Sequence, residues 1–236
     1  SAQSKQERCF PAFSICLCYF TENHPGTREK VRLDPAALQS LSLLSYLLQS
    51  FTMRKPELVC PAGSLPALKT AVDNGADTVY LGLKDAATNA RNFAGLNFDA
   101  KTAREGVSYA HSRGRKVLMA INTFPQAGEE ARWHKTVDTA AELGVDAVIM
   151  ADPGLLAYAA KTHPQLRRHL SVQGSATNYE AINLARDLFG IQRAVLPRVL
   201  TLPQVEHVIA HTDVEIEVFG FGSLCVMVEG RCLLSS

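Results

Sequence analysis

The stretch "LVCPAGSLPALKTAVDNGADTVYLGL", residues 58–83, indicates the fold class most clearly. It begins and ends in short apolar runs of the kind that form buried strands. A helical stretch near 64–75 separates the two runs and ends at Gly75, a residue that helix C-terminal caps favour. The junction "NGAD" then has the length of a helix-to-strand turn in a parallel sheet. The stretch therefore predicts one strand–helix–strand unit.

The same alternation continues along the rest of the chain. The junctions "LGVD" and "LFGIQR" repeat the short turn, and Gly114, Gly144 and Gly190 each follow a helical stretch. The predicted strands lie near 57–60, 78–83, 116–122, 146–151, 169–174, 193–197 and 214–221, and the predicted helices near 64–75, 99–113, 129–143, 153–162, 179–189 and 202–211.

Seven strand–helix steps without a reversal favour a TIM-like (β/α) barrel over a doubly wound sheet. No G-x-G-x-x-G motif follows the first strand, which also argues against a dinucleotide-binding fold. A closed barrel of this class has eight strands, and the pattern supplies about seven. We therefore expect an α/β domain over 53–236 whose barrel is truncated at the C-terminus or is closed by another element.

Residues 1–52 differ in character from this domain. "DPAALQSLSLLSYLLQSF" predicts one helix with Asp34 as its N-cap, but the residues before it show neither helical nor strand periodicity. Cys16 and Cys18 lack partners at metal-ligand spacing. We interpret 1–52 as an N-terminal extension that is non-native or disordered apart from one helix, with Met53 as the natural start.

The bulk composition limits the function classes. The chain has 236 residues, about half of them apolar, and a formal net charge of +1, which argues against strong non-specific binding of nucleic acid or membrane surfaces. No apolar run approaches the ~20 residues of a membrane span, and no secretion signal is recognisable, so we expect a cytoplasmic protein. Six cysteines are too few and too uneven for a disulfide scaffold.

In a (β/α) barrel the chemistry lies at the carboxyl ends of the strands. Amides, carboxylates and arginines gather there in this sequence and suit a small anionic or polyoxygenated ligand. The candidate substrate-binding residues are Asn89, Arg91, Asn122, Gln173 and Ser175, and the candidate catalytic residues are Glu217, Arg198 and Asp152.

Each candidate also has a structural explanation. Asp152 precedes Pro153 and is equally suited to cap a helix. Alternation of Ser171, Gln173 and Ser175 on one face of a strand could form a hydrogen-bonded layer without function. Arg198 and Glu217 are charges near the ends of apolar strands and could simply pair with each other.

Several catalytic templates are not supported. His207 and His211 have the i, i+4 spacing of a zinc helix, but the glutamate precedes the first histidine, where H-E-x-x-H requires it to follow. No G-x-S-x-G motif indicates an acyl-transfer serine. Cys60 is best explained as a small buried apolar residue.

The last twenty residues, "EVFGFGSLCVMVEGRCLLSS", carry the most specific motif. Thiolates are soft ligands for iron–sulfur clusters or zinc, but two of them complete neither site. The spacing here is Glu-x-Phe-x-x-Gly-small-aliphatic-Cys, four residues, then Gly-x-Cys-x-aliphatic-Ser, running from Glu217 to Ser235 through Cys225 and Cys232.

This motif resembles that of the collagenase-like peptidases of unassigned catalytic type, and the resemblance covers about 53–236. The segments "KDAATNARNFAGLNF", "AINTF", "ARW" and "VLPRVL" look most like a family member that acts in ubiquinone biosynthesis. The resemblance implies a 4Fe-4S cluster on four cysteines, of which Cys225 and Cys232 match the first two, and a heterodimer with a related paralogue.

The resemblance leaves several functions open. We expect an iron–sulfur protein needed for oxygen-independent ubiquinone hydroxylation, acting as a subunit of a hydroxylase, with an inactive truncated copy as a further possibility. The alternatives are an RNA-base hydroxylation factor and a collagenase-like protease. We doubt the protease, because the sequence shows neither a nucleophile–base pair nor a metal-protease helix.

Overall fold

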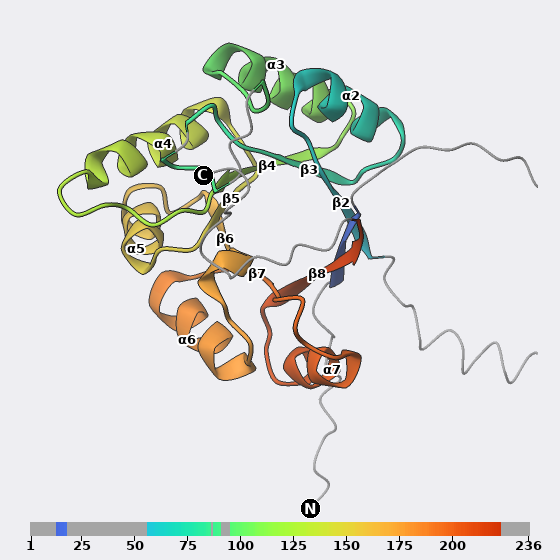
Figure 1. Ribbon diagram of the computed structural model, residues 1–236, viewed down its shortest axis with the longest axis vertical. Coiled ribbons are helices and arrows are strands. Elements are labelled where there is room, and N and C mark those ends of the chain that lie inside the picture. The colour runs from blue at the N-terminus through green and yellow to red at the C-terminus, as the bar shows by residue number, and fades with distance from the viewer. Residues whose placement is uncertain (1–12, 18–55, 86, 91–94, 223–236) are drawn as a thin grey trace, which may run out of the picture. The chain divides into compact units, whose positions relative to one another are not determined.

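The computed structural model describes residues 13–17, 56–85, 87–90 and 95–222. Parallel strands and helices alternate through this part of the chain, and the helices surround the strands (Figure 1). The strands are β1 (Phe13–Leu17), β2 (Glu57–Pro61), β3 (Thr78–Leu81), β4 (Lys116–Ile121), β5 (Ala147–Met150), β6 (Arg167–Leu170), β7 (Arg193–Val195) and β8 (Glu215–Phe221). The α-helices are α2 (Leu65–Asp73), α3 (Ala100–His111), α4 (Glu130–Leu143), α5 (Pro153–Thr162), α6 (Tyr179–Phe189) and α7 (Leu202–Ala210).

The seven predicted strands are confirmed, and an eighth strand closes the ring. β1 pairs in parallel with β2 through Ser14 and Glu57, and with β8 through Ser14 and Glu217. The strand order is therefore a closed barrel from β1 to β8. The sequence pattern did not predict β1, because parallel barrel strands are covered on both faces and need not alternate apolar with polar residues. The helix expected within 1–52 and the domain boundary at 53 lie outside the described residues.

Most helix boundaries follow from local capping. Asp99 caps α3 in a capping box with Thr102, where the backbone N–H of Thr102 donates to Asp99 Oδ1 at 2.8 Å. At their other ends, α4 and α6 stop at Gly144 and Gly190, whose φ angles of 71° and 62° are left-handed. Glycine therefore marks the ends of these helices because it adopts a left-handed backbone conformation easily.

The apolar residues form two clusters, one on each side of the strand ring. Val117 and Met119 on β4 belong to the large cluster that also contains helix residues such as Leu68 and Trp133. Leu118, between them, belongs to a small cluster with Val59, Ala147 and Ile149, against which Tyr80 packs. Because successive strand residues point to opposite faces, the small cluster fills the barrel interior and the large one joins strands to helices.

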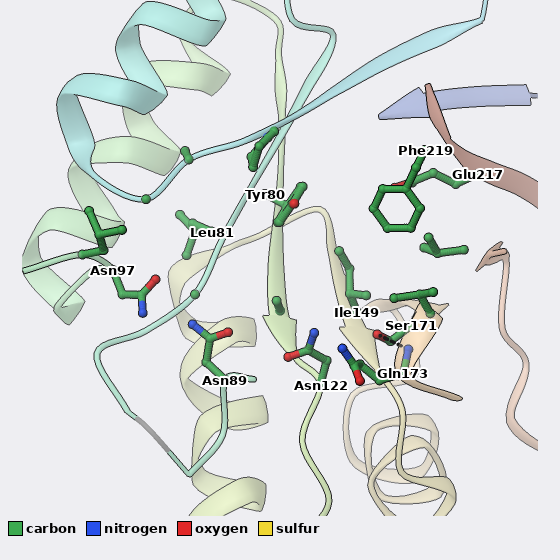
Figure 2. Close-up of a pocket in the computed structure, with 18 residues that line it drawn as sticks. Tyr80, Leu81, Asn89, Asn97, Asn122, Ile149, Ser171, Gln173, Glu217 and Phe219 are labelled. Carbon is green, nitrogen blue, oxygen red and sulfur yellow. Dashed lines mark hydrogen bonds between the residues drawn. The ribbon is translucent and has the colours of Figure 1, made fainter. Parts of the chain in front are cut away.

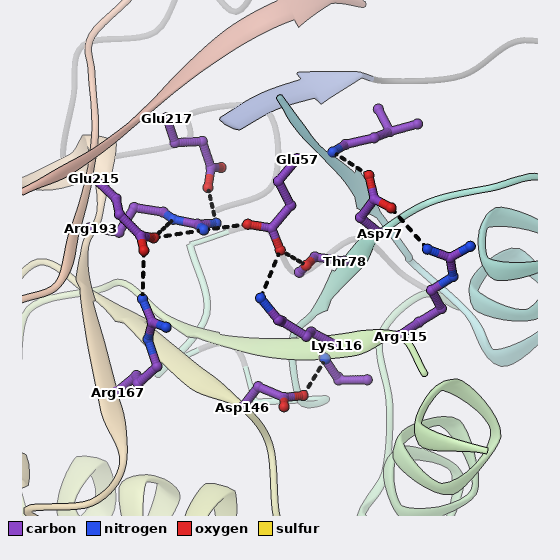
Figure 3. Close-up of polar contacts among 12 residues, drawn as sticks. Glu57, Asp77, Thr78, Arg115, Lys116, Asp146, Arg167, Arg193, Glu215 and Glu217 are labelled. Atoms are coloured by element: carbon purple, nitrogen blue, oxygen red, sulfur yellow. Dashed lines mark hydrogen bonds and ion pairs between the residues drawn. The ribbon is translucent and has the colours of Figure 1, made fainter. Parts of the chain in front are cut away.

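An ionic network occupies the interior at the amino ends of the strands (Figure 3). Arg193, at the start of β7, contacts the carboxylates of Glu57, Glu215 and Glu217, and its side chain is only 5% exposed. Arg167 and Lys116 add contacts to Glu215 and Glu57. Three carboxylates around one buried guanidinium satisfy its donors, as a buried cation requires. This network forms a polar layer at that end of the barrel interior.

Candidate functional site

A cavity of about 240 Å³ opens inside the barrel at the carboxyl ends of the strands (Figure 2). On the strands, lining residues such as Tyr80 and Ile149 are followed or preceded by residues of the large cluster, such as Val79 and Met150, as the two-residue period of a strand requires. Polar side chains in the lining come from β8 and from the segments that follow β3, β4 and β6: Asn89, Asn97, Asn122, Ser171, Gln173 and Glu217. Aromatic and aliphatic side chains, among them Tyr80, Ile149, Val195 and Phe219, complete the lining.

Four of the residues singled out from the sequence line this cavity: Asn89, Asn122, Gln173 and Glu217. Asn122 directly follows β4, and its Oδ1 accepts a hydrogen bond at 3.1 Å from the backbone N–H of Ala90. The same bond ties the loop after β3 to the end of β4. The barrel topology therefore brings together amides that lie far apart in the chain.

The strand predicted near 169–174 is wrong in its second half. β6 ends at Leu170, and Ser171 is the N-cap of a short 3₁₀ turn over Val172–Gly174. The Ser171 Oγ accepts from the backbone N–H of Gln173 at 3.2 Å, because a serine side chain competes for nearby backbone donors. Ser171 and Gln173 still line the cavity, whereas Ser175 ends the turn with a φ of 52° and is not part of the lining.

Asp152 and Arg198 have contacts outside the cavity lining. Asp152 is the N-cap of α5, where its Oδ1 accepts from the backbone N–H of Leu155 at 2.8 Å. Arg198 does not pair with Glu217; its guanidinium lies 3.7 Å from the ring centroid of Phe219. Phe219 itself lines the cavity, so Arg198 contacts a residue of the site without being part of the cavity lining.

Glu217 is the charged member of the described lining. The residue is 3% exposed, and its Oε2 accepts from Arg193 Nη1 at 3.3 Å. Burial raises the pKa of Glu217 above its ordinary value, although the nearby Arg193 opposes that shift. The Glu217 side chain thus contacts both the ionic network at the amino ends of the strands and the cavity at their carboxyl ends.

The sequence analysis did not identify several residues that complete the site. Tyr80 faces the cavity from β3, two residues beyond the inward-facing Thr78. Asn97, with a left-handed φ of 73°, donates its backbone N–H to the Gly63 carbonyl at 2.7 Å and so joins two loops at the cavity. The position of Tyr80 could have been predicted from the sequence, because side chains along a strand alternate between the barrel interior and the helices. Nothing in the local sequence indicated Asn97.

No group of three or more potential metal ligands occurs among the residues that the structure describes. The predicted cluster ligands Cys225 and Cys232, and the predicted substrate residue Arg91, lie outside those residues. Cys60 is buried in the large apolar cluster. The rings of His207 and His211 lie close together but tilted, with centroids 4.2 Å apart, and His211 stacks on Tyr179. None of the described helices is long and apolar enough to cross a membrane.

A ring of parallel strands with a polar cavity at its carboxyl ends defines a TIM-like barrel protein with a ligand site at the barrel mouth. The chain belongs to Peptidase family U32, whose model matches residues 63–236. The structure titled "The Structure of the U32 Peptidase Mk0906" superposes with a TM-score of 0.56 at 19% identity, covering 68% of this chain and 66% of that one. This likeness supports the barrel fold.

Several curated relatives carry functional names. The chain is 35% identical over 184 residues to tRNA hydroxylation protein P of Escherichia coli K12, covering 78% of this chain and 40% of that protein. It is 32% identical over 179 residues to the 23S rRNA 5-hydroxycytidine C2501 synthase of the same strain, covering 76% and 26%. The chain therefore spans well under half the length of these relatives.

These comparisons confirm the family inferred from the terminal motif and refine the expected subgroup. The sequence segments suggested the ubiquinone-biosynthesis protein UbiU, with a UbiV-like paralogue as its partner. The two RNA hydroxylation relatives instead favour the alternative of RNA hydroxylation over UbiU.

Proposed function

We propose that this chain is the barrel region of an RNA-base hydroxylation protein and that the cavity at the barrel mouth receives the target base. The observation that carries the proposal is a cavity lined by neutral amides, by the hydroxyl residues Tyr80 and Ser171 and by one carboxylate, in a chain similar to proteins named for tRNA and rRNA hydroxylation. Enzymes that modify a base take it out of the stack into such a pocket and read its edge by hydrogen bonds.

The size of the cavity favours a single base. Pockets for drug-sized ligands enclose about 300–1,000 Å³, and the cavity here, at about 240 Å³, is smaller. The amides of Asn89, Asn122 and Gln173 can each donate and accept, as the mixed edge of a base demands. Tyr80 and Phe219 add aromatic surface on which a base can stack.

Exposed aromatic rings continue this surface outward. Phe124, two residues beyond Asn122, is 45% exposed, and Phe221, at the end of β8, is 62% exposed. β4 and β8 are four strands apart in the eight-stranded barrel. The side chains of Phe124 and Phe221 therefore belong to opposite sides of the barrel mouth. Nucleotides on either side of the target base could stack on them, since base stacking needs no net positive charge. This accommodates the formal net charge of only +1.

The cofactor remains a prediction within this proposal. Family resemblance implies a 4Fe-4S cluster, which would supply electron transfer or activation of the oxygen donor, with Cys225 and Cys232 as two of its ligands. The described residues neither contain these thiols nor offer a substitute group. The proposal therefore assigns to the described residues only the binding and orientation of the base.

The test is nucleoside analysis of RNA from cells that lack the gene. Mass spectrometry of digested tRNA and rRNA is expected to show loss of a hydroxylated pyrimidine, restored by the native gene but not by a gene carrying Asn122→Ala and Gln173→Ala. Asp138→Asn is the control, because Asp138 contacts Tyr158 and His163 away from the cavity. Unchanged RNA together with a loss of ubiquinone in anaerobic cells would contradict the proposal and restore the UbiU-like hypothesis.

A further inference from the structure

We propose that Glu217 is the specificity-determining residue of the cavity and accepts a hydrogen bond from an N–H on the edge of a pyrimidine base. Arg193 is the positioning residue that holds this carboxylate. The inference rests on the proposed function, because it assigns to one residue the reading of the base that the cavity receives.

Glu217 has one oxygen engaged and one available. Its Oε2 accepts from Arg193 Nη1, while Oε1 has no hydrogen-bond partner within the described part of the chain. The residue is 3% exposed and the little surface it keeps belongs to the cavity lining. Oε1 is not among the fully buried atoms that lack a partner, so it is open to the cavity, and a ligand that brings an N–H to this position can donate to it.

The other polar groups of the lining are less selective. The Asn122 Oδ1 already accepts from Ala90, and the Ser171 Oγ from Gln173. Amides and hydroxyls can also turn to donate or accept, whereas an ionised carboxylate only accepts. Glu217 is therefore the group of the described lining that distinguishes a base N–H from an acceptor nitrogen.

Arg193 positions Glu217 through only one of the two carboxylate oxygens. The same guanidinium lies 2.8 Å from Glu215 Oε2 and is also bonded to Glu57, so its contact with Glu217 at 3.3 Å is a long one (Figure 3). Arg193 can only donate. In a Glu217→Gln variant the amide oxygen is therefore expected to stay on Arg193, which turns the NH₂ group toward the cavity and replaces an acceptor with a donor.

Glu215 offers a matched control. It lies two residues earlier on β8, faces the same interior and contacts the same Arg193, but it is not part of the cavity lining. Glu215→Gln and Glu217→Gln each remove one negative charge from the same network. Only Glu217→Gln changes a residue of the cavity lining.

The experiment is calorimetric titration of the chain and both variants with methylated and unmethylated nucleosides. Uridine is paired with 3-methyluridine, and cytidine with N4,N4-dimethylcytidine, so that in the second member of each pair methyl groups replace every N–H of the base. For the pair that the native chain distinguishes, Glu217→Gln is expected to weaken binding of the unmethylated nucleoside about tenfold or more. It should change binding of the methylated nucleoside little, because that ligand has no N–H to lose. Glu215→Gln should preserve the discrimination.

The outcomes separate the two proposals. Equal losses for methylated and unmethylated nucleosides, or a loss in Glu215→Gln as large as in Glu217→Gln, would overturn the role of Glu217 and leave the base pocket intact. A native chain that binds no pyrimidine nucleoside would overturn the proposed function and this inference with it. Thermal unfolding of each variant checks the fold.

Discussion

The side chain of Asn89 lies directly against Gly82, at a place where no Cβ would fit. A methyl group built on Gly82 would come within 2.0 Å of Asn89 Nδ2 and 2.6 Å of its Cγ. Gly82 follows β3, and both residues line the cavity. The absence of a side chain at position 82 is therefore what lets the amide of Asn89 reach the site.

Gly82→Ala is expected to displace Asn89 from the cavity wall. Ligand affinity should fall about tenfold, the scale of one lost hydrogen bond to the ligand. The free energy of unfolding should change by less than about 1 kcal/mol, because the end of a flexible side chain can move aside. Gly106→Ala is the control, since its methyl would also come close to a side chain, at 2.9 Å from Leu68 Cδ1, but Gly106 lies on α3 and is not part of the cavity lining. Equal affinities for the two variants, measured by calorimetry with uridine or cytidine, would contradict this prediction.

Removal of Arg193 should destabilise the barrel strongly. Arg193→Met leaves Glu57, Glu215 and Glu217 without their shared cation, and a broken buried ion pair costs about 3–5 kcal/mol. Urea denaturation gives the free energy of unfolding. Lys116→Met is the control, because Lys116 is 54% exposed and its contact with Glu57 is an exposed ion pair worth less than about 1 kcal/mol. Similar losses for both variants would show that burial of Arg193 is not decisive.

The acid dependence of stability should carry a contribution from Glu57. Burial alone would raise the pKa of Glu57, but the hydrogen bond from Thr78 and the charge of Arg193 lower it to about 2 from the ordinary 4.5. A pKa lowered by folding gives stability that is complete above the unfolded pKa and is lost as the pH falls toward 2, about 3 kcal/mol in total.

The difference between the native chain and Glu57→Gln isolates this contribution. Glu217 acts in the opposite direction, because burial raises its pKa, so the native pH dependence alone mixes both effects. Urea denaturation at pH 6 and at about pH 3 should show the native chain losing more stability than the variant. Parallel losses in the two proteins would mean that Glu57 does not hold the low pKa.

Phe124→Ala tests the stacking surface at the cavity mouth. A stacked base is worth about 1–3 kcal/mol, so affinity for a single-stranded pyrimidine oligonucleotide should fall about tenfold. The slope of affinity against salt should not change, because no phosphate contact is removed. Leu188→Ala is the control, since Leu188 is 62% exposed on α6, among the helices that surround the barrel. Fluorescence anisotropy across a salt series measures both quantities, and a reduced slope would indicate a phosphate contact instead.

The predicted iron–sulfur cluster can be tested by anaerobic reconstitution. If Cys225 is a ligand, the reconstituted protein, extended to the length of its relatives, should hold iron and sulfide and show the broad visible absorbance of such clusters, which Cys225→Ala abolishes. Cys60→Ala is the control, because Cys60 is buried in the apolar cluster between strands and helices. A colourless, iron-free native protein would refute the cluster.

Seven strands and six helices followed from the sequence because their signals are local. Apolar runs, N-caps such as Asp99 and left-handed glycines such as Gly144 act within a few residues of the elements they define. Placement of Asn122 and Gln173 at the cavity also followed, since the barrel rule assigns strand ends to one mouth. Ser171 was misplaced on a strand because its side chain bonds to the nearby backbone, a competition that periodicity does not register.

The family, the order of strands and helices, and the set of polar residues at the strand ends could thus be predicted from the amino-acid sequence. Closure of the ring and the pairing of its charges are properties of the folded barrel. β1 joins β8 across some 200 residues of chain, and Arg193 meets Glu57 across 136 positions. Contacts of that kind depend on the radius and register of the closed barrel, and no local pattern encodes them. For this reason only the three-dimensional structure shows that Arg193 pairs with Glu217 and that Arg198 stacks on Phe219.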